Sequence, residues 1–313
     1  MEFQPIAAAP PESLARPKRA ALRPASRRLR WYAAALLGPA VLLLIALLVV
    51  PLAYLFRASF NRFDPIFVMQ PAFVLDNYRR FFTDGSTLSV LWSTLLFGVE
   101  VTLLTLALAF PVARWISRPG RRLRQLWLGL VILPFTLNTA VLAFGWVVIL
   151  GETGFLNTAL LGLHLVGRPL QMIFTPGAVV VALVQALMPY QVLSLLATFG
   201  RIDPALEEAA ANLGAGRFTV LRRVVFPLAL PGVLAGSTFT FLATVTAFVT
   251  PRIIGGGRIR LMGSIVYEQI FQNNNWPFAA AVSFILMAVT LAAFLLTRRL
   301  AGQEYLAHQQ AFG

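Results

Sequence analysis

Long runs of apolar residues dominate the chain, and short polar stretches separate them. Six of these runs are long enough to cross a bilayer, for which a helix needs about 20 residues. Within these runs the single charged residue is Glu100. None of the runs alternates polar and apolar residues with the two-residue period of barrel strands, so we predict six transmembrane helices. Their approximate ranges are 31–56, 88–113, 125–150, 176–199, 228–249 and 278–297.

The composition points to the same class of protein. Of the 313 residues, 58% are hydrophobic and 12% are charged, whereas a soluble domain carries about 25% charged residues. This is too little charge to cover a water-facing surface, so we predict an all-α integral membrane protein embedded in a lipid bilayer. A net charge of +14 in a soluble domain would favour nucleic acid. Here it is explained by basic connections on one side of the membrane, and no nucleic acid partner is expected.

The positive charges predict the orientation of the chain. Eighteen of the 26 Lys and Arg residues fall in the two terminal tails and in the connections after the second and fourth spans. This asymmetry predicts that both termini are cytoplasmic. We divide the chain into a disordered basic tail (1–30), a six-helix permease domain (31–300) and a C-terminal cytoplasmic tail (301–313). The connections on the other side, 57–87, 151–176 and 251–277, include a predicted short helix near 76–82.

The sequence offers little catalytic chemistry. It contains no Cys, and its two His residues lie far apart, so thiolate chemistry and a multi-His metal site are not expected. A membrane-embedded enzyme needs a cluster of acids, His or nucleophiles at one depth, which Glu100 alone does not provide. No G-x-x-x-x-G-K-[ST] run occurs, so the chain should bind no nucleotide itself.

A few polar groups inside the spans are candidates for contact with a transported solute. Glu100 could attract a cation or could hydrogen-bond to a neighbouring helix, and both interpretations remain open. Most uncharged polar groups in spans stabilise helix packing. The uncharged candidates for the path are Asn138, Gln185 and Thr244, with Gln191 and Thr246 as further polar positions, and Pro134, Pro189 and Pro231 are candidate hinge points.

The connection from 201 to 227 has a pattern of its own, RIDPALEEAAANLGAGRFTVLRRVVFP. Asp203 followed by Pro204 predicts a helix N-cap and first helical position. A narrow apolar stripe follows at helical spacing, and Gly214 predicts the end of the helix. Such a helix suits either docking into a groove on a protein partner or a purely structural linker. The stripe consists of Leu206, Ala209, Ala210 and Leu213.

These residues resemble a known signature. Glu208-Ala209-Ala210, Gly214 four residues later and Pro227 at the end match the EAA loop, EAA-x3-G-x9-I-x-LP, of membrane permeases in bacterial binding-protein-dependent ABC importers. Val224 stands for the usual Ile and Phe226 for the usual Leu. The similarity extends over about 30–300 and is greatest to spermidine and putrescine permeases. Related permeases handle aminophosphonates, thiamine or ferric iron.

The resemblance implies a type I ABC importer permease fold in the bacterial inner membrane. It implies that the 201–227 loop forms a coupling helix that docks on a dimeric cytoplasmic ATPase, which binds ATP and Mg²⁺, so that this chain binds no cofactor. A second permease subunit, most simply a different chain, and a periplasmic binding protein would complete the importer. The alternative is a self-contained secondary transporter or channel that uses Glu100. The expected coupling residues are Glu207, Glu208, Ala209, Ala210, Leu213, Gly214, Arg217 and Pro227.

Overall fold

A computed structural model describes residues 27–118 and 120–311, with side chains placed for 36–118, 120 and 122–299. The basic tail predicted over 1–30 therefore lies almost wholly outside the described residues. At the other end, the backbone of the last helix continues to Ala311, through most of the predicted C-terminal tail.

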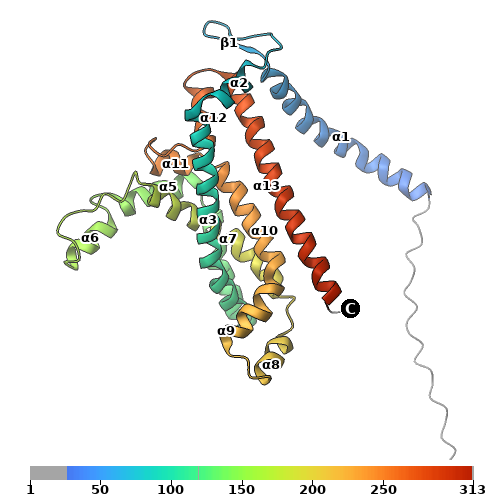
Figure 1. Ribbon diagram of the computed structural model, residues 1–313, viewed down its shortest axis with the longest axis vertical. Coiled ribbons are helices and arrows are strands. Elements are labelled where there is room, and N and C mark those ends of the chain that lie inside the picture. The colour runs from blue at the N-terminus through green and yellow to red at the C-terminus, as the bar shows by residue number, and fades with distance from the viewer. Residues whose placement is uncertain (1–26, 119, 312–313) are drawn as a thin grey trace, which may run out of the picture. The chain divides into compact units, whose positions relative to one another are not determined.

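The described chain is mainly helical, with one short antiparallel hairpin in which Arg62 of β1 lies opposite Gln70 of β2 (Figure 1). The α-helices are α1 (Arg27–Ala58), α2 (Asp76–Thr83), α3 (Gly85–Ser117), α4 (Arg121–Ile132), α5 (Thr139–Leu150), α6 (Phe155–Gly162), α7 (Pro176–Phe199), α8 (Pro204–Asn212), α9 (Arg217–Val220), α10 (Phe226–Val245), α11 (Val249–Ile254), α12 (Met262–Phe271) and α13 (Trp276–Ala311). A 3₁₀ turn η1 (Leu133–Thr136), a π-helical segment η2 (Leu221–Val225) and the strands β1 (Arg62–Asp64) and β2 (Val68–Gln70) complete the chain.

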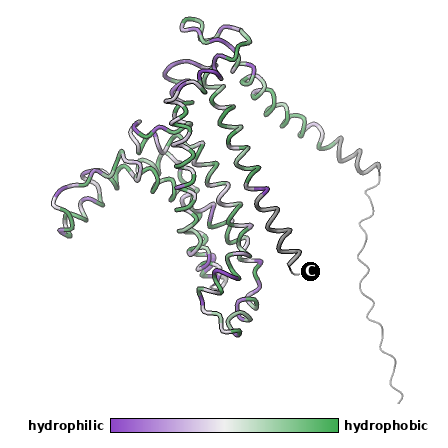
Figure 2. Tube along the Cα trace, in the orientation of Figure 1, coloured by the Kyte–Doolittle hydropathy of each residue, from purple (hydrophilic) through white to green (hydrophobic). Residues whose placement is uncertain are grey.

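Six helical stretches of the described chain are long and apolar enough to cross a membrane. Figure 2 shows their apolar character along α3, α10 and α13, with polar residues gathered in the connections. The stretches are Leu36–Ala58, Gly85–Ser117, Thr139–Gly162, Pro176–Phe199, Arg217–Val245 and Trp276–Arg299. Five of the predicted spans overlap these stretches over most of their length, and the fourth has the predicted bounds. The third overlaps its counterpart only over 139–150.

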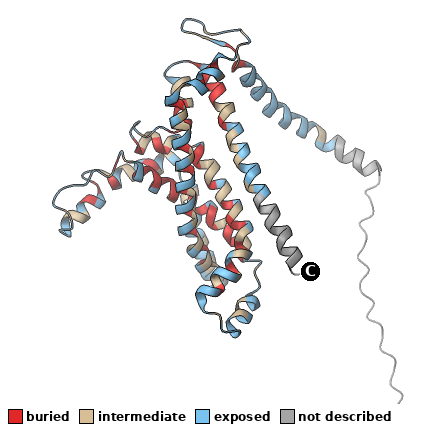
Figure 3. Ribbon diagram, in the orientation of Figure 1, coloured by how far each residue is buried: buried red, intermediate tan, exposed pale blue. Residues whose placement is uncertain are grey.

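The chain forms two units, one ending at Tyr54 and the other beginning at Leu55. In the first unit, α1 presents exposed apolar side chains, such as Leu36 and Leu42, around its circumference (Figure 3). The second unit contains the remaining helices, the hydrophobic core and the candidate functional site.

The core of the second unit is a bundle of α3, α7 and α10, which lie side by side (Figure 1). Helix α7 is the most buried span (Figure 3). Close approach of α10 to α7 depends on Gly232, because a Cβ there would lie 2.9 Å from the backbone oxygen of Ser194. The Ser194 hydroxyl in turn donates a 2.9 Å hydrogen bond to the Gly232 carbonyl oxygen. Small residues therefore set the spacing of these spans, as in other membrane helix pairs.

The third predicted span is wrong in one respect, because 125–150 is not one continuous helix. Helix α4 ends at Ile132, η1 follows, and α5 begins at Thr139. Pro134 lies within η1, and Asn138 caps α5 by accepting a 2.8 Å hydrogen bond from the Ala140 amide. Proline cannot donate a backbone hydrogen bond, which favours the break at this point.

The other two candidate hinge prolines behave differently from Pro134. Pro189 lies inside the uninterrupted α7, and Pro231 lies inside the uninterrupted α10. Neither proline divides its span. A break in the helix is therefore found at one of the three candidate positions.

Candidate functional site

Helix α8 stands out because it lies outside the span bundle, at the end where α7 finishes and α9 begins (Figure 1). The carboxylate of Asp203 caps it by accepting a 2.9 Å hydrogen bond from the Ala205 amide, and Pro204 occupies the first turn. At the other end Gly214 has φ +84°, a conformation that favours glycine. The start and stop signals in the sequence therefore predicted this helix correctly.

The apolar stripe of α8 is left largely uncovered by the rest of the described chain. No residue of the helix is buried, and the side chain of Leu213, its C-cap, is 89% exposed. Leu206 is also exposed, whereas Ala210 packs partly against the core cluster beneath it. An apolar face with this exposure is available to a partner.

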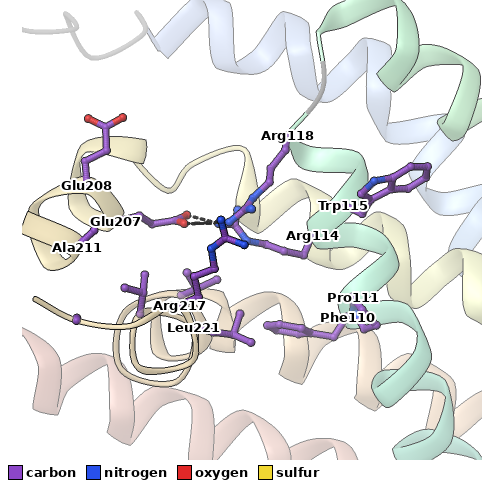
Figure 4. A pocket seen from close by; sticks show the side chains of 13 residues that line it. Phe110, Pro111, Arg114, Trp115, Arg118, Glu207, Glu208, Ala211, Arg217 and Leu221 are labelled. Carbon is purple, nitrogen blue, oxygen red and sulfur yellow. Dashed lines mark hydrogen bonds and ion pairs between the residues drawn. The ribbon is translucent and has the colours of Figure 1, made fainter.

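One ion pair joins α8 to the span bundle. Both carboxylate oxygens of Glu207 accept hydrogen bonds from Nη2 of Arg114 in α3 (Figure 4). Nη2 of Arg118, one turn further along α3, lies 3.5 Å from Oε2 of Glu207. The side chains of Arg114 and Glu207 are only 18% and 20% exposed, so solvent screens their attraction less than that of a surface pair.

Arg114 is also in contact with the end of α7. Its guanidinium carbon lies 5.8 Å from the ring centroid of Phe199, within the range of a cation–π contact. Phe199 packs edge-on against Phe110 of α3, with a centroid distance of 5.4 Å. The Arg114 guanidinium therefore lies where α3, α7 and α8 meet.

A cavity of about 630 Å³ opens beside this ion pair. Its floor is apolar and its rim carries Arg118, Glu208 and Arg217. Glu208 points away from Arg114, in contrast to its neighbour Glu207 (Figure 4). The full lining is Phe110, Pro111, Arg114, Trp115, Arg118, Glu207, Glu208, Ala211, Ala215, Arg217, Val220, Leu221 and Val225.

The remaining residues predicted for the loop have different surroundings. Ala209, Gly214 and Arg217 are exposed. Pro227 lies in the first turn of α10, directly after the π-helical segment. The structure thus gathers Glu207, Glu208 and Arg217 around one cavity, while Leu213 and Gly214 lie at the outer end of α8. Sequence reasoning missed Arg114 and Arg118, whose only signal was their positive charge.

The polar residues predicted for a solute path do not form one cluster. Glu100 lies on an exposed face of α3, and Asn138 caps α5. The side-chain oxygen of Gln185 accepts a hydrogen bond from Trp146 Nε1 at 3.4 Å. Thr244 is fully buried and donates to the Thr240 carbonyl at 2.8 Å. Gln185 and Thr244 thus make contacts within and between helices.

The two further polar positions in the spans also differ from each other. Gln191 is fully buried and accepts a 3.4 Å hydrogen bond from the Thr240 hydroxyl. Thr246 lies just after α10 and lines a second cavity, of about 350 Å³, between η1, α7 and α10. It is therefore the member of the predicted set that the structure places on a cavity wall.

At the opposite end of the bundle, Glu268 of α12 holds two arginines (Figure 1). Its Oε1 lies 3.5 Å from Nη1 of Arg252, and its Oε2 is paired with Nη2 of Arg260. Among the residues that the structure describes, no group of three His, Asp or Glu side chains is placed to hold a metal ion.

Comparison with known proteins places the chain among transport proteins. The profile of the family "Binding-protein-dependent transport system inner membrane component" matches residues 106–302. The chain is 31% identical over 264 residues to the spermidine/putrescine transport system permease protein PotB of Escherichia coli, covering 83% of this chain and 96% of PotB. It is 32% identical over 273 residues to the inner membrane ABC transporter permease protein YdcU of the same organism, covering 82% and 86% of the two chains.

The fold is similar to that of a solved transporter. A chain from the crystal structure of a bacterial alginate ABC transporter, in complex with an alginate-bound periplasmic protein, superposes with a TM-score of 0.70 at 17% identity, covering 88% of this chain and 95% of that one. With six apolar spans and matches over most of its length, the chain belongs to the inner membrane components of binding-protein-dependent ABC transport systems and is a permease subunit rather than an enzyme.

Proposed function

We propose that the chain forms part of the translocation path of an ATP-driven importer that takes up a polyamine such as spermidine or putrescine. The observation that carries this proposal is α8, a capped helix with an exposed apolar face that an ion pair fastens to the spans. A helix of this kind can receive a movement from a partner and pass it to the spans, which a purely structural connection would not require.

The coupling step depends on contact with a separate ATPase. In this proposal the ATPase dimer binds ATP and Mg²⁺, and its closure displaces α8. The fully exposed Leu213 enters an apolar groove on the ATPase, and the exposed Glu208 and Arg217 supply polar contacts at its edge. Glu207 faces inward to Arg114 and transmits the displacement to α3. Ala209, Ala210 and Gly214 permit close approach, and Pro227 marks the end of the loop.

The orientation follows from the distribution of charge. Eighteen of the 26 basic residues lie in the tails and in the connections on the side of α8, which supports a cytoplasmic position for both termini and α8. The connections at the other end, which include the β1–β2 hairpin and α6, then face the periplasm. These connections are available for a solute-binding protein, and the similar alginate transporter was solved in complex with a periplasmic protein.

A second permease subunit would complete the path. The cavity between η1, α7 and α10 is open on one side in this chain, and a second chain can close it. The relative PotB is named for a polyamine system, and such systems pair two different permeases, so we favour a heterodimer over a homodimer.

A polyamine is the favoured solute because relatives that match 83% and 74% of the chain carry that name. An aminophosphonate is the second candidate, since the chain is 28% identical over 205 residues to a permease named for 2-aminoethylphosphonate transport. Thiamine and ferric iron are further alternatives within the resemblance.

The test begins with purification of the chain from its native host in mild detergent, with mass spectrometry of the proteins that accompany it. We expect an ATPase, a second permease and a binding protein. The purified complex in liposomes should then hydrolyse ATP faster when the binding protein carries spermidine. Recovery of the chain alone, with solute uptake that needs no ATP, would overturn the importer proposal in favour of a secondary transporter or channel.

The docking face can be tested separately. Leu213→Asp should release the ATPase from the detergent complex, because it places a charge in an apolar contact. Leu163→Asp is the matched control, since Leu163 is also exposed and follows α6, in a different connection from α8. Retention of the ATPase by both variants would contradict the docking role of α8.

A further inference from the structure

Two breaks in the helical chain, one just before the third span and one just after the fifth, meet at one cavity. The first is the break between α4 and α5, where Pro134, Phe135 and Leu137 line the cavity of about 350 Å³. The second is the stretch between α10 and α11, where Thr246 and Phe248 line the same cavity. Irregular backbone at membrane depth is tolerated where it is buried in protein or lines a water-filled cavity. This cavity is therefore the candidate for a solute site.

Three aromatic residues, Phe135, Tyr190 and Phe248, line the cavity. The ring of Tyr190 in α7 lies 4.3 Å, centroid to centroid, from that of Phe135 in η1. Tyr190 and Phe248 are exposed in this chain and Phe135 is half-buried, so neighbouring helices do not fully cover their rings. The face of an aromatic ring carries negative charge density and attracts a cation within about 6 Å of its centroid.

The polar groups of the cavity are suited to an ammonium group as well. None of the described lining residues carries a charge, and the hydroxyls of Thr139, Tyr190, Thr246 and Thr250 can accept hydrogen bonds from N–H groups. The C-cap of α10, Thr246, also lines the cavity, and the partial negative charge of a helix C-terminus favours a cation. At the N-terminus of α5, which lines the cavity through Thr139, the Asn138 side chain accepts a hydrogen bond from one amide, that of Ala140.

The nearby positive charge is partly offset within the chain. Arg252 follows Thr250 by two residues, yet its guanidinium is paired with Glu268 and lies 5.6 Å from the Tyr267 ring centroid. Glu100, the acidic residue expected from sequence to attract a cation, is not among the residues that line the cavity. Attraction of a cation at this point would therefore come from rings, hydroxyls and the helix terminus.

We propose that Phe135, Tyr190 and Phe248, the three aromatic residues that line this cavity, form a transient site for the alkylammonium groups of the solute, through the faces of their rings. The proposal deepens the proposed function and rests on it. A site without a carboxylate binds a multiply charged amine weakly, and weak binding is required of a site from which solute must also leave. The two breaks supply the space, and the aromatic cluster supplies the selectivity for cations.

The test uses the complete complex in liposomes, with its ATPase, second permease and spermidine-loaded binding protein. Trifluorophenylalanine placed at Phe248 or Phe135 removes negative charge from the ring face while keeping its shape. We expect the initial rate of spermidine uptake to fall about 3- to 10-fold, and by a smaller factor with monofluorophenylalanine, because a cation–π contact weakens in proportion to the charge on the ring face. Tyr190→Phe should retain most of the uptake, and Tyr190→Leu should lose it.

A matched control separates this effect from general damage. Phe144 is an exposed aromatic residue of α5 that does not line the cavity, so trifluorophenylalanine at this position should leave uptake unchanged. Equal uptake across the fluorinated series at Phe135 and Phe248 would overturn the aromatic site while leaving polyamine import intact. Absence of spermidine and putrescine uptake by the unmodified complex, with ATP hydrolysis stimulated by another solute, would overturn the polyamine assignment and the ammonium site together.

Discussion

Arg114 and Glu207, 93 residues apart in the chain, form an ion pair at the point where α3, α7 and α8 meet. Because α8 buries none of its own residues, this pair is a principal attachment of the helix to the spans. Further attachments of α8 are Arg118, which lies 3.5 Å from Glu207, the packing of Ala210 on the core cluster and the contacts with α9 and η2. In the proposed function, a displacement of α8 would pass to α3 through the ion pair.

Reversal of the charge at Arg114 should uncouple the importer. Arg114→Glu places two carboxylates in contact. Loss of a charged hydrogen bond at a mostly buried pair weakens the attachment of α8 to α3 by about 1–3 kcal/mol. We expect the complex to assemble but solute-stimulated ATP hydrolysis to fall about 10-fold, because about 1.4 kcal/mol corresponds to a factor of ten. The double variant Arg114→Glu with Glu207→Arg restores the opposite charges and should recover at least part of the coupling. No recovery in the double variant would show that the pair itself does not couple α8 to α3.

The substitution Gly214→Ala tests the C-terminal end of α8 without introducing a steric clash. Its φ of +84° is unfavourable for other residues, and no atom lies within 4 Å of the position that a Cβ would occupy. Gly214→Ala should therefore weaken the end of α8 by about 1 kcal/mol through the backbone alone, and raise the Kd for the ATPase about 5-fold. Gly216→Ala is the control, because Gly216 has φ −64° and equally open surroundings. An equal effect of the two substitutions would contradict this account.

Gly232 should be intolerant of a side chain. A Cβ there would lie 2.3 Å from the Thr198 hydroxyl and 2.9 Å from the backbone oxygen of Ser194, so Gly232→Ala must force α10 away from α7. Overpacking of this kind costs about 1–3 kcal/mol, which a lowered midpoint of thermal unfolding in detergent will report. Gly177→Ala in α7 has open space around it and should leave the midpoint unchanged or raise it. A Gly232→Ala protein as stable as the parent would mean that the two helices are not packed this closely.

The first turn of α3 should depend on pH through Asp84. Hydrogen bonds from Thr87 and Ser86 to its carboxylate lower the pKa of Asp84 below its usual range. The stabilisation is therefore fully present above the pKa of the unfolded chain, about 3.9, and is lost as the pH falls through the lower folded value. Amide hydrogen exchange at Ser86, corrected for the intrinsic rate, should increase on acidification below pH of about 4. Asp84→Asn keeps an acceptor but cannot titrate, so its exchange should show no such step.

The sequence predicted α8 well because the signals for a short capped helix are local. Asp203, Pro204 and Gly214 specify its ends through their own backbone preferences, which do not depend on distant residues. The fourth span was predicted equally well, since Thr175 and Pro176 start it and Gly200 follows it. In both cases the information lies within a few residues of the boundary.

The break in the third span was not predictable from hydropathy. Both α4 and α5 are apolar over most of their length, so a window averaged across 125–150 contains no interruption. Pro134 alone was an ambiguous signal, because Pro189 lies in an unbroken helix. What distinguishes the two positions is their surroundings, since η1 faces a cavity whereas Pro189 is buried in the bundle.

Arg114 was missed for a different reason. In the sequence it is one of several arginines after the second span, and its partner Glu207 stands 93 positions away. Only the packing of α3 against α7 brings the two side chains together. The same holds for the cluster of Phe135, Tyr190 and Phe239, whose members come from three separate elements.

The π-helical segment η2 sets the rotation of the preceding loop, 201–220, relative to α10, and deletion of one residue would change that rotation. In a π-helix each hydrogen bond spans one more residue than in an α-helix. The extra residue lies just before Pro227. In a continuous α-helix the ring of this proline would clash with the carbonyl four residues earlier. Deletion of one residue from 221–225 would restore ordinary α-helical geometry and turn everything before it by about 100° relative to α10. Glu207 would then point away from Arg114, although every residue of the EAA motif up to Gly214 would still be present.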